Sequence, residues 1–282
     1  MDTAVFRDQV VIITGASAGI GRAMAIQLAR QGSKVAIAAR RADRLEEVAA
    51  VCRASGADVL TVPTDVSDEA QCKALVDKTT SAFGGLDMLV NNAGLAASAL
   101  FDDYHDLTLF RHTMDVNLFG AVFCSYYALP YLKERHGRIL AISSLGGKTA
   151  IPYNTPYCAS KYGLHGFCDS LRMELKQHGV TITVVCPWWV ATEFHAAQLN
   201  KDGEPRGPAR GKDYYTSKTM TADRCAEIAL RAACKRRREV LMGPGRLAVW
   251  LKLLAPGMLD WLSIKIFLEP AARRAREARA RE

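Results

Sequence analysis

The chain has 282 residues, of which 49% are hydrophobic and 23% are charged, and it carries a formal net charge of +8. A chain of this length and balance can bury a substantial core as one large domain, which excludes an intrinsically disordered protein. From Arg224 onward Lys and Arg outnumber Asp and Glu by 14 to 6, whereas the two classes are equal before it. Nucleic-acid-binding proteins more often carry their basic residues on a folded reading surface, so no nucleic-acid partner is expected.

Cysteine placement and the N-terminal segment indicate an intracellular setting. The eight cysteines are scattered, with no CxxC pair and no cluster of Cys and His at metal-ligand spacing. We therefore expect reduced thiols and no metal site. The segment Met1 to Gln9 contains Asp2, Arg7 and Asp8 and lacks the apolar run of a signal peptide, so a cytoplasmic protein is predicted.

Short apolar runs rich in β-branched residues alternate with stretches of helical periodicity from the start of the chain. The predicted strands are Val10 to Thr14, Lys34 to Ala38, Asp58 to Val62, Met88 to Val90, Arg138 to Ser143 and Val180 to Cys186. The predicted helices include Ala23 to Arg30, Leu45 to Ser55, Glu69 to Phe83 and Leu107 to Leu132. This alternation predicts an α/β fold with a doubly wound parallel sheet of the Rossmann type. The amino-acid composition shows no domain boundary within residues 1–245, which favours one domain followed by a C-terminal helical extension, 246–282.

A glycine-rich turn follows the first predicted strand and precedes a helix. Without Cβ atoms the backbone there can approach a dinucleotide pyrophosphate, and the helix N-terminus supplies N–H donors and a positive dipole end. The candidate cofactor residues of this turn are Gly15, Ser17, Gly19, Ile20 and Gly21. The alternative is a glycine-rich turn that holds no ligand.

The end of the second strand indicates which dinucleotide is used. An NAD site usually places Asp or Glu there, whereas an NADP site has cations for the 2′-phosphate. Here the strand ends in Arg40 and Arg41, with no carboxylate beside them. A guanidinium on the phosphate contributes about 1.5–3 kcal/mol, so NADP(H) is predicted. The alternative is that both arginines only begin the solvated face of the next helix.

Tyr157 and Lys161 are four residues apart at the head of a predicted helix, so their side chains share one face. Ser144 follows the strand Arg138 to Ser143, at the edge where open α/β sheets bind ligands. A carbonyl that accepts hydride needs a proton donor and a second hydrogen-bond partner, which Tyr157 and Ser144 can supply. Since a free phenol has a pKa of about 10, we expect the Lys161 ammonium and an oxidised nicotinamide to stabilise the phenolate.

The conjunction of Thr14-Gly15-x-x-x-Gly19-Ile20-Gly21, Asn91-Asn92-Ala93-Gly94, Ser144 and Tyr157-x-x-x-Lys161 resembles the short-chain dehydrogenase/reductase family. The resemblance extends to about Thr192, with each motif in order. It implies that Asn92, Ala93 and Gly94 lie beside the adenosine half of the cofactor, and that Asp65 and Val66 face the adenine. It also implies that Asn117 is a fourth catalytic residue, holding a water in a proton relay through Lys161.

The segment Pro187, Val190 and Thr192 resembles the part of the family that grips the nicotinamide carboxamide. The usual glycine after that proline is here Trp188, which puts an indole next to the predicted reaction centre. With Trp189 it is expected to bind a large apolar substrate. A substrate loop over 188–221 follows, and its portion Asn200 to Asp213 has the Gly, Pro and charge content of a mobile loop.

The region Leu247 to Leu268 predicts two short amphipathic helices, because Lys252, Pro256, Asp260 and Lys265 interrupt its apolar sequence. One interpretation is packing over the substrate cleft or against a second subunit, which exposed apolar helices usually require. The other is peripheral binding to an anionic membrane through the tryptophans and the arginine-rich segment Ala271 to Glu282.

These observations predict an NADP(H)-dependent oxidoreductase that interconverts a secondary alcohol and a ketone, with a large apolar substrate such as a steroid, a lipid-like or an aromatic ketone. The resemblance also implies a homodimer or homotetramer through the helices around Asn117 and Tyr157. The competing hypothesis is a regulatory protein of the same fold that binds NADP(H) without turnover.

Overall fold

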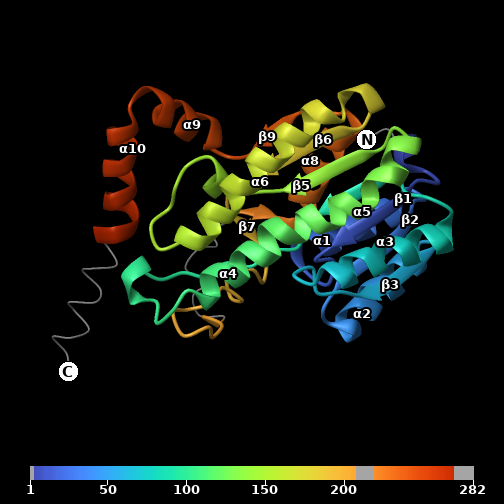
Figure 1. Cartoon of the computed structure of the whole chain (residues 1–282), viewed down its shortest axis with the longest axis horizontal. Coiled ribbons are helices and arrows are strands. Elements are labelled where there is room, and N and C mark those ends of the chain that lie inside the picture. Colours follow the sequence, from blue (N-terminus) through green and yellow to red (C-terminus); the bar gives the residue numbers. More distant parts are fainter. Residues whose placement is uncertain (1–2, 208–218, 270–282) are drawn as a thin grey trace.

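A seven-stranded parallel sheet forms the centre of the protein (Figure 1). The computed structural model describes residues 3–207 and 219–269. The strands lie in the order β3-β2-β1-β4-β5-β6-β9, and all neighbours are parallel. Their bounds are β1 Val10–Thr14, β2 Lys34–Ala39, β3 Val59–Pro63, β4 Met88–Asn91, β5 Arg138–Ile142, β6 Thr181–Cys186 and β9 Glu239–Leu241. The predicted doubly wound sheet is confirmed.

Helices cover both faces of this sheet. The core on one face includes α1 (Gly19–Ala29), α2 (Ala42–Arg53) and α8 (Ala222–Cys234), and the core on the other includes α3 (Glu69–Phe83), α5 (Gly120–Glu134) and α6 (Thr155–Glu174). The remaining elements are the strands β7 (Val190–Ala191) and β8 (Met220–Thr221), the helices α4 (Thr108–Met114), α9 (Gly245–Leu254) and α10 (Pro256–Ser263), and short turns η1 (Thr3–Phe6), η2 (Phe101–Asp103), η3 (Asp115–Phe119), η4 (Leu145–Gly147), η5 (Lys176–His178) and η6 (Ile264–Leu268).

Strand β1 explains why both faces must be covered. All five of its residues are buried. Its side chains alternate between the two cores, with Val11 and Ile13 on the α1 side and Val10 and Ile12 on the α3 side. Burying apolar surface contributes about 25 cal/mol per Å², so a continuous apolar strand gains this on both sides only when helices flank the sheet.

The helix predicted over Leu107 to Leu132 is divided. Helix α4 passes through a π-helical turn, η3, before α5 begins at Gly120. At that point the chain presses against the segment after β3, since a Cβ on Gly120 would lie 2.8 Å from Cγ2 of Val66. Such π-helical turns often mark functional sites, and this one contains Asn117.

Strand β9 was not expected from the sequence. It has only three residues, each partly exposed, so it carries neither the length nor the alternation of a recognisable strand. Pairing with β6 forms it, with Glu239 opposite Val184 and Leu241 opposite Cys186. Tertiary contact therefore decides this edge of the sheet.

The order of the strands reverses between β1 and β4, where one half of the sheet winds away from the other. Loops leaving the carboxyl ends of these two strands diverge, which creates the crevice where open α/β sheets bind ligands. The glycine-rich turn follows β1, and the Asn92-Ala93-Gly94 segment follows β4. The fold thus brings the two predicted cofactor segments to the same edge.

The C-terminal helices α9 and α10 extend away from the sheet (Figure 1). Lys252 anchors α9 by donating to the carbonyl oxygen of Lys148, 2.9 Å away. Most large apolar side chains of this region nevertheless remain exposed in the described chain, so they do not line a closed cleft. They are Leu247, Trp250, Leu253, Leu254, Met258, Trp261, Ile264 and Ile266. None of the helices within 3–207 and 219–269 is long and apolar enough to cross a bilayer.

The substrate loop is described in part. Its first portion folds back on the segment after β4, because the Ser98 N–H donates to the Leu199 carbonyl and the Leu199 N–H donates to Ala96, each at 2.9 Å. Residues 208–213 of the predicted mobile loop and the arginine-rich segment Ala271 to Glu282 lie outside the described residues. All eight cysteines are free thiols, as predicted.

Gly21 and Gly166 are both helical and form a matched pair. A Cβ on Gly21 would lie 2.4 Å from the Gly15 carbonyl oxygen, whereas one on Gly166 would meet nothing within 4 Å. We expect Gly166→Ala to raise the free energy of unfolding by about 0.5–1 kcal/mol. Gly21→Ala is expected to lower it by about 1–3 kcal/mol, because the added methyl group forces the backbone apart. Urea unfolding measures both, and equal stability of the two variants would contradict the close packing at Gly21.

Candidate functional site

The glycine loop between β1 and α1 is held against the end of β4. Gly15 and Gly19 have φ angles of +65° and +54°, which favour glycine. A Cβ on Gly15 would lie 2.7 Å from Cα of Ala93. The Asn92 side chain donates to the carbonyl oxygens of Thr14 and Gly15, at 2.9 and 3.1 Å. Asn92 therefore braces the glycine loop.

The N-terminus of α1 faces the same crevice. Its N-cap is Ala18, and no side chain of the described residues caps it. Free N–H groups and the positive end of the helix dipole make such a terminus suited to a phosphate. Ser17 and Ile20 flank this turn and are partly exposed. The predicted pyrophosphate-binding residues therefore lie together, in a cradle that side chains at the glycine positions would fill.

Of the two arginines after β2, Arg41 reaches the glycine loop. Both Arg40 and Arg41 are exposed. The Arg41 guanidinium donates to Oγ of Ser17 at 3.4 Å and lies 3.8 Å from a carboxylate oxygen of Glu193. Burial opposes ionisation of Asp65, but hydrogen bonds from Ser67 and the charge of Arg40 outweigh it and lower the pKa of that carboxyl. Glu193, a carboxylate across the crevice, was missed because 152 positions of sequence separate it from Arg41.

Tyr157 and Ser144 meet at the predicted reaction centre. Ser144 is the residue before η4 and Tyr157 lies in the first turn of α6. Their side chains lie close together, since a Cβ on Gly146 would be 3.4 Å from Cε1 of Tyr157 and 3.5 Å from Oγ of Ser144. Ser144 Oγ also accepts from the Gly146 N–H at 3.1 Å. In contrast, the buried Oγ of Ser143 has no hydrogen-bond partner among the described residues. This geometry supports Ser144 over Ser143 as the partner of the tyrosine.

Burial controls the acidity of both Tyr157 and Lys161. Burial raises the pKa of Tyr157 to about 12, against a smaller lowering by the Ser144 hydrogen bond. Burial also lowers the pKa of Lys161 to about 8. The Lys161 Nζ donates to the Ile142 carbonyl at 2.9 Å and lies 5.8 Å from the centre of the Tyr157 ring. Loss of solvent is thus the largest influence on the acidity of Tyr157 in this structure.

Both polar atoms of the Asn117 side-chain amide are hydrogen bonded. Its Nδ2 donates to the Leu95 carbonyl and to Ser160 Oγ, each at 2.9 Å, and its Oδ1 accepts from the Leu95 N–H at 2.8 Å. A Cβ on Gly94 would lie 3.2 Å from this Oδ1 and 3.7 Å from Lys161 Nζ. Asn117 and Lys161 also line one small cavity with Val66 and Ala93. Asn117 and Lys161 therefore both lie beside Gly94, as expected if the two side chains act in one proton relay.

The segment 187–192 runs between the serine loop and the glycine loop. The Pro187 carbonyl accepts from the Leu145 N–H at 3.2 Å. At the other end, a Cβ on Gly19 would lie 3.2 Å from Cγ2 of Thr192. Val190 is buried between them and pairs with Met220. This placement connects the cofactor cradle with the reaction centre.

Aromatic rings follow this segment and reach Tyr157. Phe194 lies 5.9 Å from the Tyr157 ring, and His195 lies 4.9 Å from the Trp189 ring, measured between centroids. Trp188 packs instead against Gly243, where a Cβ would approach within 2.9 Å of the Trp188 Cβ. The ring beside Tyr157 is therefore that of Phe194. Phe194 and His195 were missed as site residues, although their position in an aromatic cluster was a signal.

Comparison with known proteins agrees with this geometry. A family model described as short chain dehydrogenase matches residues 9–203. An 11-beta-hydroxysteroid dehydrogenase of Pinus massoniana is 34% identical over 270 residues, which cover 92% of this chain and 74% of that protein. An alcohol dehydrogenase of Thermococcus sibiricus complexed with 5-hydroxy-NADP has a TM-score of 0.71 and 28% identity, covering 83% of this chain and 95% of that chain. A short chain dehydrogenase/reductase of Burkholderia phymatum in complex with NAD has a TM-score of 0.80 and 26% identity, covering 90% and 95%.

The half-buried Tyr157 should remain a neutral phenol in the free protein. Its pKa is raised to about 12, so the phenolate forms only at higher pH than for an ordinary tyrosine. Between about pH 8 and 10.5, where ordinary phenols ionise, we expect the ultraviolet phenolate signals of the wild-type chain and Tyr157→Phe to coincide. A wild-type signal larger by one ionised tyrosine would contradict this assignment.

Proposed function

This chain belongs to the short-chain dehydrogenase family of oxidoreductases, and we propose that it interconverts a secondary alcohol and a ketone with NADP(H). The observation that carries the proposal is the approach of Ser144 and Lys161 to Tyr157, with Ser144 Oγ and the Tyr157 ring both beside Gly146 and Lys161 Nζ 5.8 Å from the ring centroid. The substrate is a small molecule whose carbonyl or hydroxyl oxygen meets these two hydroxyl groups.

The residues of the cradle fit a nicotinamide dinucleotide. Gly15, Gly19 and the uncapped start of α1 would hold the pyrophosphate, and the segment 187–192 would hold the nicotinamide end. When bound, the cofactor supplies or accepts the hydride and, in its oxidised form, adds a positive charge. Arg40 and Arg41 would bind the 2′-phosphate, since no carboxylate stands at the end of β2.

The chain itself handles the proton. For reduction, the Tyr157 O–H bond breaks and its proton passes to the carbonyl oxygen, while Ser144 Oγ–H donates to the same oxygen. For oxidation, Tyr157 must act as a base, and lowering its pKa from about 12 to near 7 requires about 7 kcal/mol. A single ammonium 5.8 Å from the ring supplies about 3 kcal/mol at an effective dielectric constant of about 20. Ionisation of Tyr157 therefore needs a second positive charge in addition to Lys161.

A large apolar substrate is supported by the aromatic wall. Phe194, His195 and Trp189 form a continuous series of ring contacts that ends at Tyr157. Flat rings of this kind bury large areas of a polycyclic ketone. The relative from Pinus massoniana carries the name of a hydroxysteroid dehydrogenase. We therefore favour a steroid or a similar fused-ring ketone.

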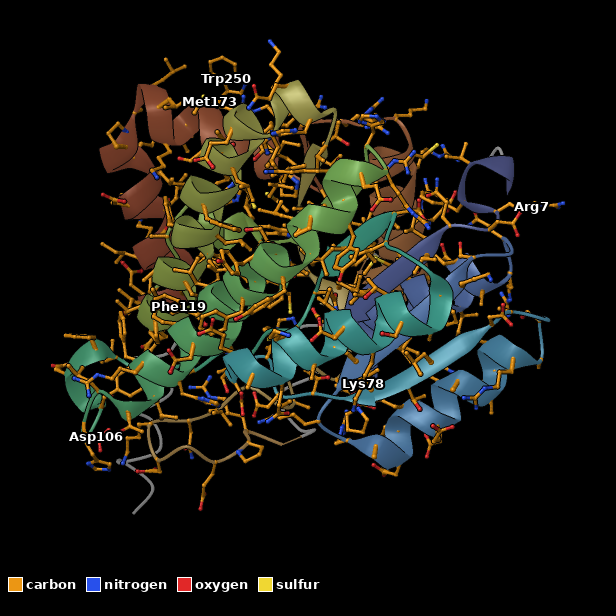
Figure 2. The ribbon with its side chains drawn as sticks, turned by 45° about the vertical axis from the view of Figure 1, so that its right-hand side comes forward. Arg7, Lys78, Asp106, Phe119, Met173 and Trp250 are labelled. Atoms are coloured by element: carbon orange, nitrogen blue, oxygen red, sulfur yellow. The ribbon has the colours of Figure 1, made fainter. Side chains whose placement is uncertain are left out.

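The surface supports two further contacts. Phe119 and Met173 are exposed on η3 and α6 (Figure 2), and Tyr126 is exposed on α5. We propose that a second copy of the chain covers these three side chains. The exposed apolar side chains of α9 and α10, which include Trp250 and Trp261, lie elsewhere along the chain. Arginines dominate the sequence that follows them. We propose that this region binds an anionic membrane surface on the cytoplasmic side.

Removing the Tyr157 hydroxyl should abolish the chemistry. With a panel of ketones and alcohols, Tyr157→Phe is expected to lower kcat/KM by about 10²–10⁴-fold while NADPH still quenches protein fluorescence. Tyr126→Phe is the control, since Tyr126 is 67% exposed on another helix. A wild-type chain that binds NADPH but turns over no member of the panel would favour the regulatory protein instead.

The arginines after β2 should set the cofactor preference. Arg40→Ala and Arg41→Ala are each expected to raise the KM for NADPH about tenfold and to leave that for NADH nearly unchanged. Arg44→Ala is the matched control, because Arg44 lies on α2 and pairs with Glu47. Wild-type activity with NADH equal to that with NADPH would contradict the assignment.

The apolar surface of α9 and α10 should drive membrane binding. Wild-type protein is expected to sediment with vesicles of phosphatidylserine and phosphatidylcholine at low salt, and less with phosphatidylcholine alone. The double variant Trp250→Ala/Trp261→Ala should remain in the supernatant, whereas Tyr126→Ala should still sediment. If wild-type protein ignores both kinds of vesicle, the membrane contact is refuted.

A further inference from the structure

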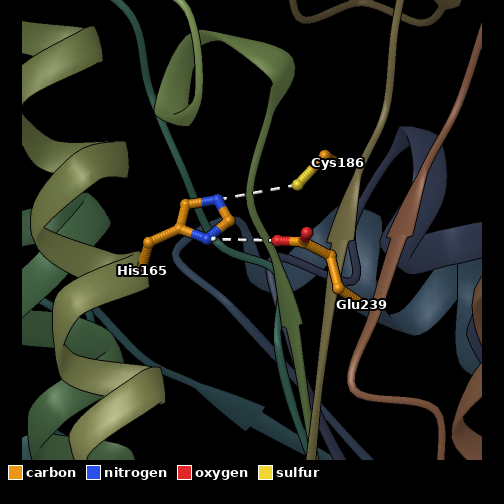
Figure 3. A group of neighbouring side chains, drawn as sticks. All are labelled: His165, Cys186 and Glu239. Atoms are coloured by element: carbon orange, nitrogen blue, oxygen red, sulfur yellow. Dashed lines mark hydrogen bonds and ion pairs between the residues drawn. The ribbon is translucent and has the colours of Figure 1, made fainter. Parts of the chain in front are cut away.

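A group of polar side chains that the proposed chemistry does not use lies against the loop that carries Ser144. Figure 3 shows His165 of α6 between Cys186, the last residue of β6, and Glu239, the first residue of β9. The imidazole Nε2 lies 3.6 Å from Cys186 Sγ, and Nδ1 lies 3.5 Å from Glu239 Oε1. The same Glu239 oxygen is 2.7 Å from Nζ of Lys148, a residue that follows η4.

The contacts of this group form one directed chain of donors and acceptors. Burial lowers the pKa of His165 to about 4 and raises that of Cys186 to about 12, so a neutral ring faces a protonated thiol. The thiol then donates to Nε2, and Nδ1 faces the Glu239 carboxylate at 3.5 Å, which lies 2.7 Å from the Lys148 ammonium. Each polar group is satisfied, as burial demands.

The geometry favours this chain over a metal site. Cys186 and Glu239 approach different nitrogens of the His165 ring (Figure 3), so no single lone pair of the imidazole points to a position between them. The Lys148 ammonium already occupies the carboxylate and would repel a cation. A zinc ion requires converging ligands and a free carboxylate.

Lys148 connects this chain to the loop that carries Ser144. The Lys148 carbonyl oxygen accepts from the Tyr162 hydroxyl at 2.5 Å and from Lys252 Nζ at 2.9 Å. One residue earlier the loop lies directly on the imidazole, since a Cβ on Gly147 would approach within 2.8 Å of His165 Cδ2. The loop is thus held at Gly147 by contact with the His165 ring and at Lys148 by the ion pair with Glu239.

We propose that the Lys148–Glu239 ion pair, seated on His165, is a positioning device that holds Ser144 against Tyr157. The four residues come from the position after η4 and from α6, β6 and β9, so the device ties the serine loop to the helix of Tyr157 and to the strand that leads into Pro187. Side-chain exposures of 25% for Lys148 and 29% for Glu239 shield the pair from much of the solvent, which makes it stronger than an ion pair on the open surface. A small displacement of a hydrogen-bond donor is enough to slow catalysis.

This role rests on the proposed function, so its test has a readout that does not need turnover. Lys148→Met removes the ammonium, Lys148→Arg keeps a cation, and Lys73→Met is the matched control at the exposed pair Lys73–Asp77. Hydrogen exchange of the amides of 145–149, measured by mass spectrometry, reports the order of the loop. We expect faster exchange in Lys148→Met alone.

In the same variants, kcat is expected to fall about tenfold in Lys148→Met with the KM for NADPH unchanged, and to recover most of the loss in Lys148→Arg. If Lys148→Met loses thermal stability, Glu239→Gln tests the same pair. Unchanged loop exchange in both variants, or a kcat no lower than that of Lys73→Met, would overturn the proposal. Stoichiometric zinc that is present in the wild type and lost in His165→Gln would also overturn it. A wild type without turnover refutes the oxidoreductase function, while loop exchange still decides the positioning role.

Discussion

The buried hydroxyl group of Thr14 connects the two halves of the sheet, and the site depends on it. It donates to the Val90 carbonyl at 3.2 Å and accepts from the N–H groups of Asn92 and Ala93 at 3.0 and 3.1 Å. These contacts join the ends of β1 and β4 at the point where the strand order reverses. Leaving such buried groups unpaired costs about 1–3 kcal/mol each, so these hydrogen bonds hold the ends of β1 and β4 together. The glycine loop, braced by Asn92, inherits that geometry.

Burial gives the reaction centre its chemical character. Loss of solvent disfavours the charged forms of both Tyr157 and Lys161, which moves their pKa values in opposite directions, to about 12 and about 8. The free protein therefore holds a neutral phenol suited to donating a proton. In a low-dielectric site an added charge interacts more strongly with its neighbours, so the acidity of Tyr157 responds strongly to what binds beside it. The polar chain under Ser144 keeps the second donor in place while this balance changes.

The sequence could name the candidate catalytic residues because their signals are local. Tyr157 and Lys161 share a helix face, the glycine turn follows a buried strand, and the arginines stand at the end of the next strand; each needs only a short stretch of chain. Contacts between distant segments could not be read in this way. The pairing of Arg41 with Glu193, the ring contact of Phe194 with Tyr157, and strand β9 each arise from packing.

By itself, the sequence determined the fold class, the first six strands of the sheet and the candidate catalytic side chains, since period-2 and period-3.6 patterns and glycine turns express steric rules of neighbouring residues. Only the tertiary structure decided the acidity of Tyr157, the outward course of α9 and α10, and the meeting of Cys186, His165 and Glu239. These depend on which surfaces exclude water, and solvent exclusion is a property of the packed molecule rather than of any segment.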